Sequence, residues 1–287
     1  MKTKFYKLIT FALLVMAVAA CTKENGSLNS LPLMTDKNDV CTAMDDINFM
    51  KYCYDNFDVN KDGKVSSIEA KAVTRIDLHN MQINSIKGIE YFSNLKYLYV
   101  NGNNFTSPNP IYHLSELEEV YIYGNLSELN LGHNKKIKIL VCSGTFTSLD
   151  VSQNTTLIKL KCYSTKLTNL NVSKNIALEY LYCGGLSLTN LDVSKNTALI
   201  ELDCSSNKLT NLNMRGCPAL RKLECDNNQM QNTALNDLFK TLPFYYGREF
   251  SSFYIGGGGY ISFRGNPGAK SCDGEIATSR GWNYPIP

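Results

Sequence analysis

The chain has 287 residues, of which 44% are hydrophobic and 19% charged, and its formal net charge is +3 at pH 7. Three of its 29 Lys and Arg residues lie in the first 20 residues, which contain no Asp or Glu, so the remaining chain carries 26 basic and 26 acidic residues. This neutral remainder gives no reason to expect a nucleic-acid partner, and we expect none.

The first 20 residues predict a secretion signal peptide. Three lysines precede an apolar run over residues 8–20, which is shorter than the roughly 20 residues that a membrane-spanning helix needs. The run ends in the sequence VAAC at residues 18–21, which resembles the lipobox of bacterial lipoproteins. This resemblance implies cleavage before Cys21 and acylation of Cys21, whereas the alternative is an ordinary signal peptide followed by a chance cysteine. We therefore expect a lipid-anchored protein of the outer membrane or cell surface.

A tether and a short helix follow the lipidation motif. Residues 21–40 begin with Cys21 and are polar and rich in Ser and Asn, which predicts a flexible tether. Residues 41–57 place apolar side chains at helical spacing and predict a short amphipathic helix. These apolar positions are Ile47, Met50, Tyr54 and Phe57.

Residues 58–69 carry oxygen donors at the ligand positions of an EF-hand calcium loop. The six predicted calcium ligands are Asp58, Asn60, Asp62, Lys64 through its carbonyl, Ser66 and Glu69. Gly63 stands at the sixth position, where such a loop turns sharply. The alternative is a polar turn that binds no ion. Because the sequence contains one such loop and calcium sensors usually use pairs, we expect a structural Ca²⁺ site.

The calcium loop leads directly into a repeat region. A helix is expected over about residues 67–72, and the first repeat begins at Val73. Residues 41–72 are therefore expected to form an EF-hand-like cap over the open N-terminal end of the repeats. Without a cap, this end would expose apolar core and a strand edge.

Between residues 73 and 228 one phrase recurs eight times: an apolar residue, two variable residues, an apolar residue, one variable residue and an apolar residue. Successive copies start 20–22 residues apart, at Val73, Leu95, Leu117, Ile137, Leu157, Leu178, Leu199 and Leu220. This period predicts a leucine-rich repeat, in which each copy forms one coil of an α/β-type repeat solenoid. A parallel β-sheet is expected on the concave face, with mostly extended segments and turns on the convex side.

The ninth position of the repeat carries an asparagine in four copies, at Asn103, Asn125, Asn207 and Asn228. An inward asparagine side chain is expected to hydrogen-bond loop backbone groups inside the turn. In the other copies it is replaced by Met81, Thr145, Thr165 and Leu186, so the predicted asparagine ladder is interrupted.

Ten cysteines would suggest disulfides in an exported protein, but five of them occupy the third apolar position of consecutive repeats. These are Cys142, Cys162, Cys183, Cys204 and Cys225. Neighbouring strands lie about 4.8 Å apart, which exceeds the roughly 3.8 Å between the Cβ atoms of a disulfide. Free buried thiols are therefore predicted, rather than disulfides or a metal site. On one continuous helix, Cys41 and Cys53 would lie about 18 Å apart and could not bond.

Residues 229–287 are expected to hold a last repeat and a mixed C-terminal cap. A helix is predicted around residues 235–242, and the repeat phrase returns over residues 261–266 as a ninth coil. Asp273 is expected to cap a final short helix, and Trp282 to cover the last core layer.

Side chains at the variable strand positions should point outward on the concave face, and seven of them are tyrosines. Tyrosine suits both protein recognition and sugar stacking, although its strand propensity alone would enrich it here. The predicted ligand-binding residues are Tyr97, Tyr99, Tyr121, Tyr123, Lys159, Lys161, Tyr163, Tyr180 and Tyr182. Acidic residues further along are expected to form a solvated surface beside Lys222, and they are Glu201, Asp203, Glu224 and Asp226.

The sequence does not predict an enzyme. Its three histidines, His79, His113 and His133, fall on different coils, and it contains no nucleophile elbow, HExxH motif or phosphate loop. Glu201 and Glu224 could be imagined as a glycosidase pair, but an open sheet offers no environment that would turn one of them into a general acid.

The chain resembles a group of leucine-rich-repeat lipoproteins of Gram-negative gut bacteria that are broadly similar to the internalin type. The resemblance covers nearly the whole chain after the signal peptide and rests on the lipobox, the EF-hand-like loop, repeats such as LTNLDVSKNTALIELDCSSN and the tail GNPG…CDGEIATSRGW. It implies a cell-envelope protein with a ligand-binding solenoid. We predict a monomeric adhesion or recognition module that binds a protein through the concave face. The alternatives are a glycan-binding envelope component and a structural envelope protein.

Overall fold

The computed structural model of the chain describes residues 38–164, 166–245 and 258–285. The predicted signal peptide, Cys21 and the tether up to residue 37 lie outside the described residues, as does Thr165. The helical segments are η1 (Val40–Ala43), α2 (Ile47–Phe57), α3 (Ser67–Ala72), η2 (Ile89–Tyr91), η3 (Asn109–His113), α4 (Asn232–Thr241) and α5 (Glu275–Thr278). None of these helices is long and apolar enough to cross a lipid bilayer.

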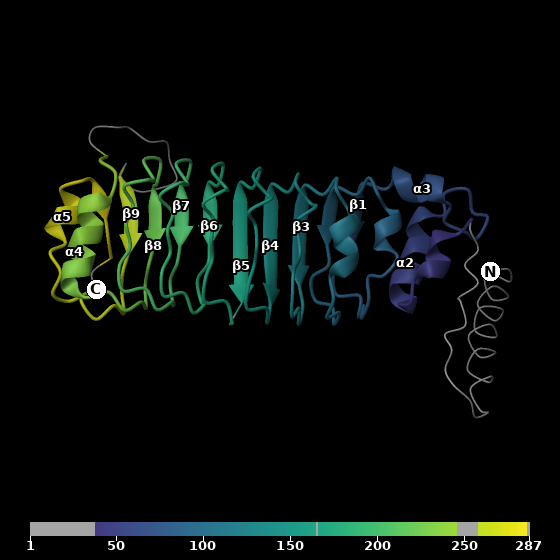
Figure 1. Cartoon of the computed structure of the whole chain (residues 1–287), viewed down its shortest axis with the longest axis horizontal. Helices are drawn as coiled ribbons and strands as arrows, with labels where there is room; N and C mark the ends of the chain where they lie inside the picture. Colours follow the sequence, from purple (N-terminus) through teal and green to yellow (C-terminus); the bar gives the residue numbers. More distant parts are fainter. Residues whose placement is uncertain (1–37, 165, 246–257, 286–287) are drawn as a thin grey trace, which may run out of the picture. The chain divides into compact units, whose positions relative to one another are not determined.

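The repeats form one sheet of ten strands in chain order, and neighbouring strands are parallel throughout (Figure 1). The strands are β1 (Arg75–Asp77), β2 (Tyr97–Tyr99), β3 (Glu119–Tyr123), β4 (Ile139–Gly144), β5 (Lys159–Ser164), β6 (Tyr180–Tyr182), β7 (Glu201–Asp203), β8 (Lys222–Glu224), β9 (Gly259–Ser262) and β10 (Trp282–Asn283). Equivalent positions of successive repeats lie side by side, as Leu98 does with Val120. The predicted solenoid with a parallel sheet is thereby confirmed.

The apolar positions of the repeat build the core. Along β2, β6, β7 and β8 a buried residue stands between two half-buried ones, which is the period of a strand with one face inward. The inward residues Leu98, Leu140 and Leu181 are fully buried. Burying one such side chain contributes about 2 kcal/mol relative to leaving it exposed, and every coil repeats this contribution.

The five cysteines of the third apolar position form a buried column. All five are fully buried, and Cys142 of β4 lies in register with Cys162 of β5. Every cysteine among the described residues is free of disulfide bonds. A hydrogen bond with Cys162, together with burial, raises the pKa of the Cys142 thiol, and burial raises the pKa of Cys183 and Cys204. The thiols therefore pack as small apolar side chains.

The N-terminal segment departs from the helix predicted over residues 41–57. It is divided into η1 and α2, because Asp46 accepts hydrogen bonds from backbone N–H groups in the first turn of α2 and so caps its start. Ile47 is 54% exposed, so its predicted place on the apolar face was wrong. The residues of α2 that are buried are Phe49 and Cys53.

Cys41 and Cys53 lie close together rather than about 18 Å apart, the separation expected on one helix. Cys41 is in η1 and Cys53 is in α2, both thiols are buried, and burial together with the neighbouring Cys41 thiol raises the pKa of Cys53. The separation of about 18 Å applied to one continuous helix, and the break between η1 and α2 removes that condition, although both cysteines are free of disulfide bonds.

Aromatic side chains of α2 pack against the first coil. The ring centroids of Phe57 and Phe92 are 5.4 Å apart, and those of Phe49 and Phe92 are 6.5 Å apart. The backbone N–H of Asp77 in β1 donates to the hydroxyl of Tyr52 at 3.3 Å. α2 therefore covers apolar core and partners the backbone of β1, where the sheet would otherwise have an open edge.

An inward asparagine ladder closes the turn after the strand in several coils. Its buried members donate Nδ2 to carbonyl oxygens of the preceding coil at 2.7–3.0 Å, and they are Asn103, Asn207, Asn228 and Asn266. Asn125 was predicted to belong to this ladder, but it is exposed, so that prediction was wrong. Leu126 takes the buried place in its coil.

A second asparagine ladder, on the return side of the coils, was not predicted. Each member is almost completely buried and donates Nδ2 to two carbonyl oxygens of the preceding coil at 2.8–3.1 Å. The members are Asn134, Asn154, Asn175 and Asn196. In the next coil Cys217 takes this place, and its Sγ lies 3.5 Å from the carbonyl oxygen of Val193. One side chain per coil thus ties each turn to its neighbour.

The C-terminal end is closed by α4, α5 and a tenth strand. Trp282 is 1% exposed and covers the last core layer, as predicted, but it lies in β10, a strand that the repeat phrase did not predict. Its Nε1–H donates to the carbonyl oxygen of Pro243 at 2.7 Å. Asp273 was predicted to cap α5, but Gly274 is the N-cap, and the Asp273 carboxylate accepts a hydrogen bond from the backbone N–H of Glu275. The helix ends before Gly281, whose φ of +81° favours glycine.

Replacing Asn175 by Ala should lower the free energy of unfolding by about 2 kcal/mol, because two buried hydrogen bonds between neighbouring coils are lost while the two carbonyl oxygens keep only their backbone donors. Chemical denaturation of the two proteins measures this difference. Asn169→Ala, an exposed position on the same return segment, is the matched control and should change stability little. Equal losses for both variants would contradict a specific role of the ladder.

The five-cysteine column should react with a thiol reagent only after the protein is unfolded, because the thiols are buried and their deprotonation is disfavoured. Counting labelled cysteines by mass spectrometry, before and after denaturant, measures this accessibility. A disulfide between any two members of the column would show the prediction to be wrong.

Candidate functional site

The outward side chains of the sheet form a surface that we call the sheet face, made of the variable positions of β1–β9. Parallel register places equivalent residues in rows, so that Tyr97 lies beside Glu119 and Tyr99 beside Tyr121. All nine residues predicted to bind ligand belong to β2, β3, β5 or β6 and point away from the core. They are half-buried except Tyr163, which is 44% exposed. The sheet face thus presents rigidly held aromatic surface to solvent.

Tyr99 and Tyr121 form a stacked pair on β2 and β3. Their ring centroids are 5.0 Å apart and their planes differ by 24°. The hydroxyl of Tyr99 donates to the carboxylate of Glu119 at 3.0 Å, and the guanidinium of Arg75 lies 4.4 Å from the Tyr99 ring centroid. Burial, and then the Glu119 carboxylate, raise the pKa of Tyr99 above its ordinary value. The pair is therefore held in one orientation before any ligand arrives.

Tyr123 and Tyr163 form a second stacked pair, across the intervening strand β4. Their centroids are 6.4 Å apart with an interplanar angle of 22°, and Ser143 stands between them in the register. The small serine leaves room for the two rings to approach. Val141 points outward beside Tyr121 and Lys161, yet it is only 2% exposed because its neighbours cover it. The predicted tyrosine patch is thus built as two stacked pairs.

Lys159 and Lys161 of β5 lie against the two tyrosines of β6. The Nζ atom of Lys161 is 4.3 Å from the centroid of Tyr182, and that of Lys159 is 6.0 Å from the centroid of Tyr180. These distances are within the range of cation–π interactions. The hydroxyl of Tyr182 donates to Glu201 of β7 at 2.8 Å. Strand β6 therefore carries neutral rings between a cationic strand and an acidic one.

Carboxylates dominate the sheet face over β7, β8 and the turn that follows β8. Glu224 pairs with Lys222 at 2.8 Å, and Asp226 accepts hydrogen bonds from the hydroxyl of Ser262 at 2.7 and 2.9 Å. Asp203 lies in register with Glu224. These carboxylates are half-buried outward side chains that make specific contacts on the surface that the sequence predicted to be solvated.

The predicted calcium loop is folded around its own carboxylates. Asp58 accepts hydrogen bonds from the backbone N–H groups of Asp62 at 3.1 Å and Gly63 at 2.9 Å, and Gly63 has the positive φ of 87° that its turn requires. Glu69 reaches back to the N–H of Val59 at 2.9 Å and forms a capping box with Ser66. The backbone N–H and the hydroxyl of Ser66 hold the pKa of Glu69 below its ordinary value.

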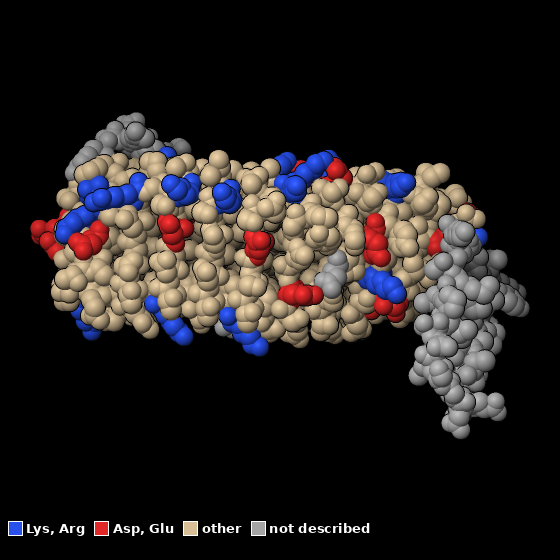
Figure 2. Space-filling model, viewed as in Figure 1, with Lys and Arg blue, Asp and Glu red and all other residues tan. Residues whose placement is uncertain are grey.

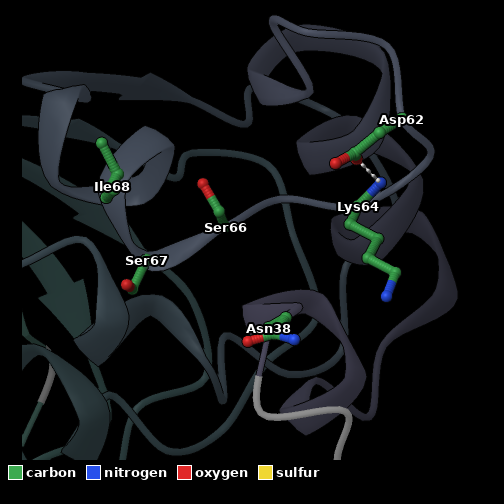
Figure 3. Close-up of a pocket in the computed structure, with 6 residues that line it drawn as sticks. All are labelled: Asn38, Asp62, Lys64, Ser66, Ser67 and Ile68. Atoms are coloured by element: carbon green, nitrogen blue, oxygen red, sulfur yellow. Dashed lines mark hydrogen bonds between the residues drawn. The ribbon is translucent and has the colours of Figure 1, made fainter.

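A shallow pocket of about 400 Å³ adjoins this loop (Figure 3). It shares three residues with the predicted calcium ligands, Asp62, Lys64 and Ser66, and Ser67, Ile68 and Asn38 line the remainder. The backbone N–H of Lys64 donates to Asp62 at 2.9 Å. Across the part of the chain that the structure describes, no three His, Cys, Asp or Glu side chains converge closely enough to hold a metal ion. The loop nevertheless supplies carboxylate, amide and carbonyl oxygens, the donors that Ca²⁺ prefers.

The histidines are not assembled with an acid or a nucleophile in any described contact. His133 shares a hydrogen bond of 2.7 Å with the hydroxyl of Tyr112, and their rings stack at 3.9 Å. His113 meets the same tyrosine edge-on at 5.6 Å. His79 lies just beyond β1. Sequence reasoning placed these histidines on separate coils and did not anticipate that Tyr112 contacts two of them.

No protein-family model and no curated protein matches the sequence, but solved structures do. The chain superposes on the functional domain of InlJ from Listeria monocytogenes with a TM-score of 0.69 and 28% identity, covering 84% of this chain and 55% of that one. The chain is a leucine-rich-repeat solenoid. The chain spans about half the length of the InlJ structure. That structure includes a cysteine ladder. In the present chain, five cysteines of consecutive coils are buried at equivalent positions.

Two further solved structures share the leucine-rich-repeat fold at low sequence identity. Internalin C2 from Listeria monocytogenes superposes with a TM-score of 0.61 and 17% identity, over 69% of this chain and 92% of that one. The leucine-rich-repeat protein LIC12759 from Leptospira interrogans superposes with a TM-score of 0.58 and 18% identity, over 76% of this chain and 62% of that one. These two likenesses establish the fold alone.

Sequence reasoning missed the groups that hold the tyrosines of the solenoid in place. Arg75, Glu119 and Glu201 contact Tyr99 or Tyr182, although none was named as part of the site. The repeat register was a usable signal, because it places Glu119 next to Tyr97 on the neighbouring strand and Glu201 next to Tyr180. The register does not predict how the side chains within a row are oriented.

Proposed function

We propose that this protein is a lipid-anchored recognition module of the bacterial cell envelope that binds a protein ligand through the sheet face. The observation that carries the proposal is the pair of stacked tyrosine groups, Tyr99 with Tyr121 and Tyr123 with Tyr163. Rigid tyrosines lose little entropy on binding and are common anchors of protein interfaces. A leucine-rich-repeat solenoid offers them on an extended surface.

The charge distribution supports a polypeptide as the ligand. On the side of the molecule drawn in Figure 2, Lys and Arg lie mostly along the two long edges, and Asp and Glu lie between them. The sheet face carries cations on β5 and carboxylates on β7 and β8. A glycan that stacks on the tyrosines is the second candidate, because a tyrosine ring is an equally good platform for a sugar. Screening the mature chain against a glycan array and, in parallel, in a protein pull-down separates the two.

The envelope location rests on the sequence of residues 1–21, which lie outside the described residues. The apolar run and the VAAC motif support acylation of Cys21, and several acyl chains on one cysteine hold a protein stably on a membrane. The tether that follows would let the solenoid stand away from the lipid.

We also propose that the loop over residues 58–69 binds Ca²⁺ and stabilises the N-terminal cap. The support is the donor set and the fold of the loop, in which Asp58 and Glu69 already face backbone N–H groups of the loop. An ion would be held by Asp58, Asn60, Asp62 and Glu69, with Ser66 and the carbonyl of Lys64. The loop belongs to the cap, and the sheet face is formed by other residues, so the ion would serve stability.

Changing Tyr99 and Tyr121 together to Ala should weaken binding of the protein ligand at least about tenfold, since losing one anchor costs about 2 kcal/mol and 1.4 kcal/mol is one decade. Biolayer interferometry with the ligand recovered by pull-down measures the affinity. Both side chains point outward, so the melting temperature should hardly change.

The matched control for this pair is Tyr91→Ala, which removes a tyrosine 45% exposed in η2 and should leave the affinity unchanged. If the double variant binds normally while Lys174→Glu with Lys195→Glu abolishes binding, the ligand docks on the return side of the coils instead.

Calcium should raise the melting temperature of the mature protein, because the ion is bound by the folded loop alone. Differential scanning fluorimetry with calcium and with a chelator measures the shift. Asp58→Ala with Glu69→Ala should abolish the shift, whereas Asp55→Ala, an exposed carboxylate just before the loop, should preserve it. Identical melting curves of the unchanged protein with calcium and with chelator would refute the site.

A further inference from the structure

On either side of β6 the sheet face holds opposite charges apart, and this separation is built into the register. Lys159 lies beside Tyr180, which lies beside Glu201, and Lys161 lies beside Tyr182, which lies beside Asp203. Each cation is thus two strands away from the carboxylate in its row, a distance of about 10 Å. An ion pair needs its N and O atoms within about 4 Å.

The two lysines of β5 have no carboxylate partner among the residues that the structure describes. Other surface lysines do, since Lys136 pairs with Glu116 and Lys138 with Glu118. The contacts of Lys159 and Lys161 are with the rings of Tyr180 and Tyr182. Both side chains are half-buried and oriented, and no carboxylate in the described part of the chain neutralises them.

The carboxylates on the other side of β6 are held in position as firmly. The Glu201 carboxylate accepts a hydrogen bond from the hydroxyl of Tyr182, and the Asp203 carboxylate accepts one from the backbone N–H of Ser205 at 3.0 Å. The Asp226 carboxylate accepts hydrogen bonds from the hydroxyl of Ser262 and from the backbone N–H of Arg264. Against these and Glu224 stands one ammonium group on β8, that of Lys222. This end of the sheet face is therefore acidic.

Tyr182 is the boundary between the two regions. The Lys161 ammonium lies over its ring and its hydroxyl donates a hydrogen bond to Glu201. Tyr182 therefore contacts both charged groups and stands between them. On a surface that binds no partner, ion pairs between these opposite charges would be favourable. On a docking surface, the unpaired charges are available to form ion pairs with the ligand.

We infer that the partner of the sheet face is a polypeptide with a bipolar docking surface: an acidic group that meets Lys159 and Lys161, and a basic group that meets the carboxylates of β7 and β8. The two groups would stand about 10–15 Å apart along the direction in which the coils are stacked, which is two to three strand spacings. The inference rests on the proposed function and adds the chemistry and the orientation of the partner.

Ligands of a single charge sign fit this surface poorly. A polyanion, such as a sulfated glycan or a nucleic acid, would gain at β5 and be repelled at β7 and β8, and a polycation would meet the reverse. A neutral glycan would leave both charge groups without a partner. A polypeptide can carry acidic and basic side chains at the required spacing, and its aromatic or apolar residues can cover the tyrosine pairs.

Selection from a random peptide library displayed on phage tests this inference on the mature chain. Peptides recovered on the unchanged protein should combine Asp or Glu with Lys or Arg separated by several residues. Lys159→Glu with Lys161→Glu should bind these peptides at least about tenfold more weakly, because two attractions become repulsions. The matched control is Lys174→Glu with Lys195→Glu, the same charge change at exposed return-side positions, which should bind them normally.

The Tyr99→Ala, Tyr121→Ala variant separates failure of this inference from failure of the proposed function. If the peptides need the tyrosines but show no charge pattern and ignore the β5 reversal, the inference is overturned and the proposed face remains. If they bind all sheet-face variants normally, or if no peptide is recovered, both are overturned. Circular dichroism and the melting temperature confirm that each variant is folded.

Discussion

The solenoid depends on one constraint: every coil must satisfy its buried backbone groups with the coil beside it. The parallel strands meet this constraint on one side, and the two asparagine ladders meet it where the chain turns. A buried carbonyl without a donor costs about 1–3 kcal/mol, so each coil can afford few exceptions. On the return side, asparagines spaced 20–21 residues apart keep the ladder in line from Asn134 to Asn196, and on the sheet side Asn266 joins its ladder although α4 is inserted before it.

Once the coils are in register, the outward residues at equivalent positions of adjacent strands lie next to one another. Strands about 4.8 Å apart place equal positions close enough for rings to stack, and Tyr99 and Tyr121 do so at 5.0 Å. A small residue between two tyrosines allows contact across a strand, as Ser143 does for Tyr123 and Tyr163. The core tolerates little change, whereas the sheet face is free to carry whatever charge and aromatic pattern a ligand requires.

At the two ends of the solenoid there is no neighbouring coil, so other elements cover the core and the strand edge. At the N-terminal end Tyr52 partners an N–H of β1 and the aromatic rings of α2 cover the first core layer. At the C-terminal end Trp282 fills the last layer and its own strand extends the sheet by one rung. The predicted calcium loop belongs to the first cap and the candidate ligand residues belong to the sheet, so the two proposed sites lie in separate parts of the chain.

The sequence by itself determined the repeat, the inward and outward sides of each strand, and the buried cysteine column, because a period of one coil and the alternation within a strand are local properties. Tertiary structure alone decided what depends on contacts between coils. The chain breaks before Ile47, so Cys41 and Cys53 belong to two separate helical segments. In the third coil the buried position is occupied by Leu126, whereas Asn125 is exposed. The return-side ladder and the placing of Lys161 over Tyr182 also arise from packing between neighbouring coils, which no single repeat encodes.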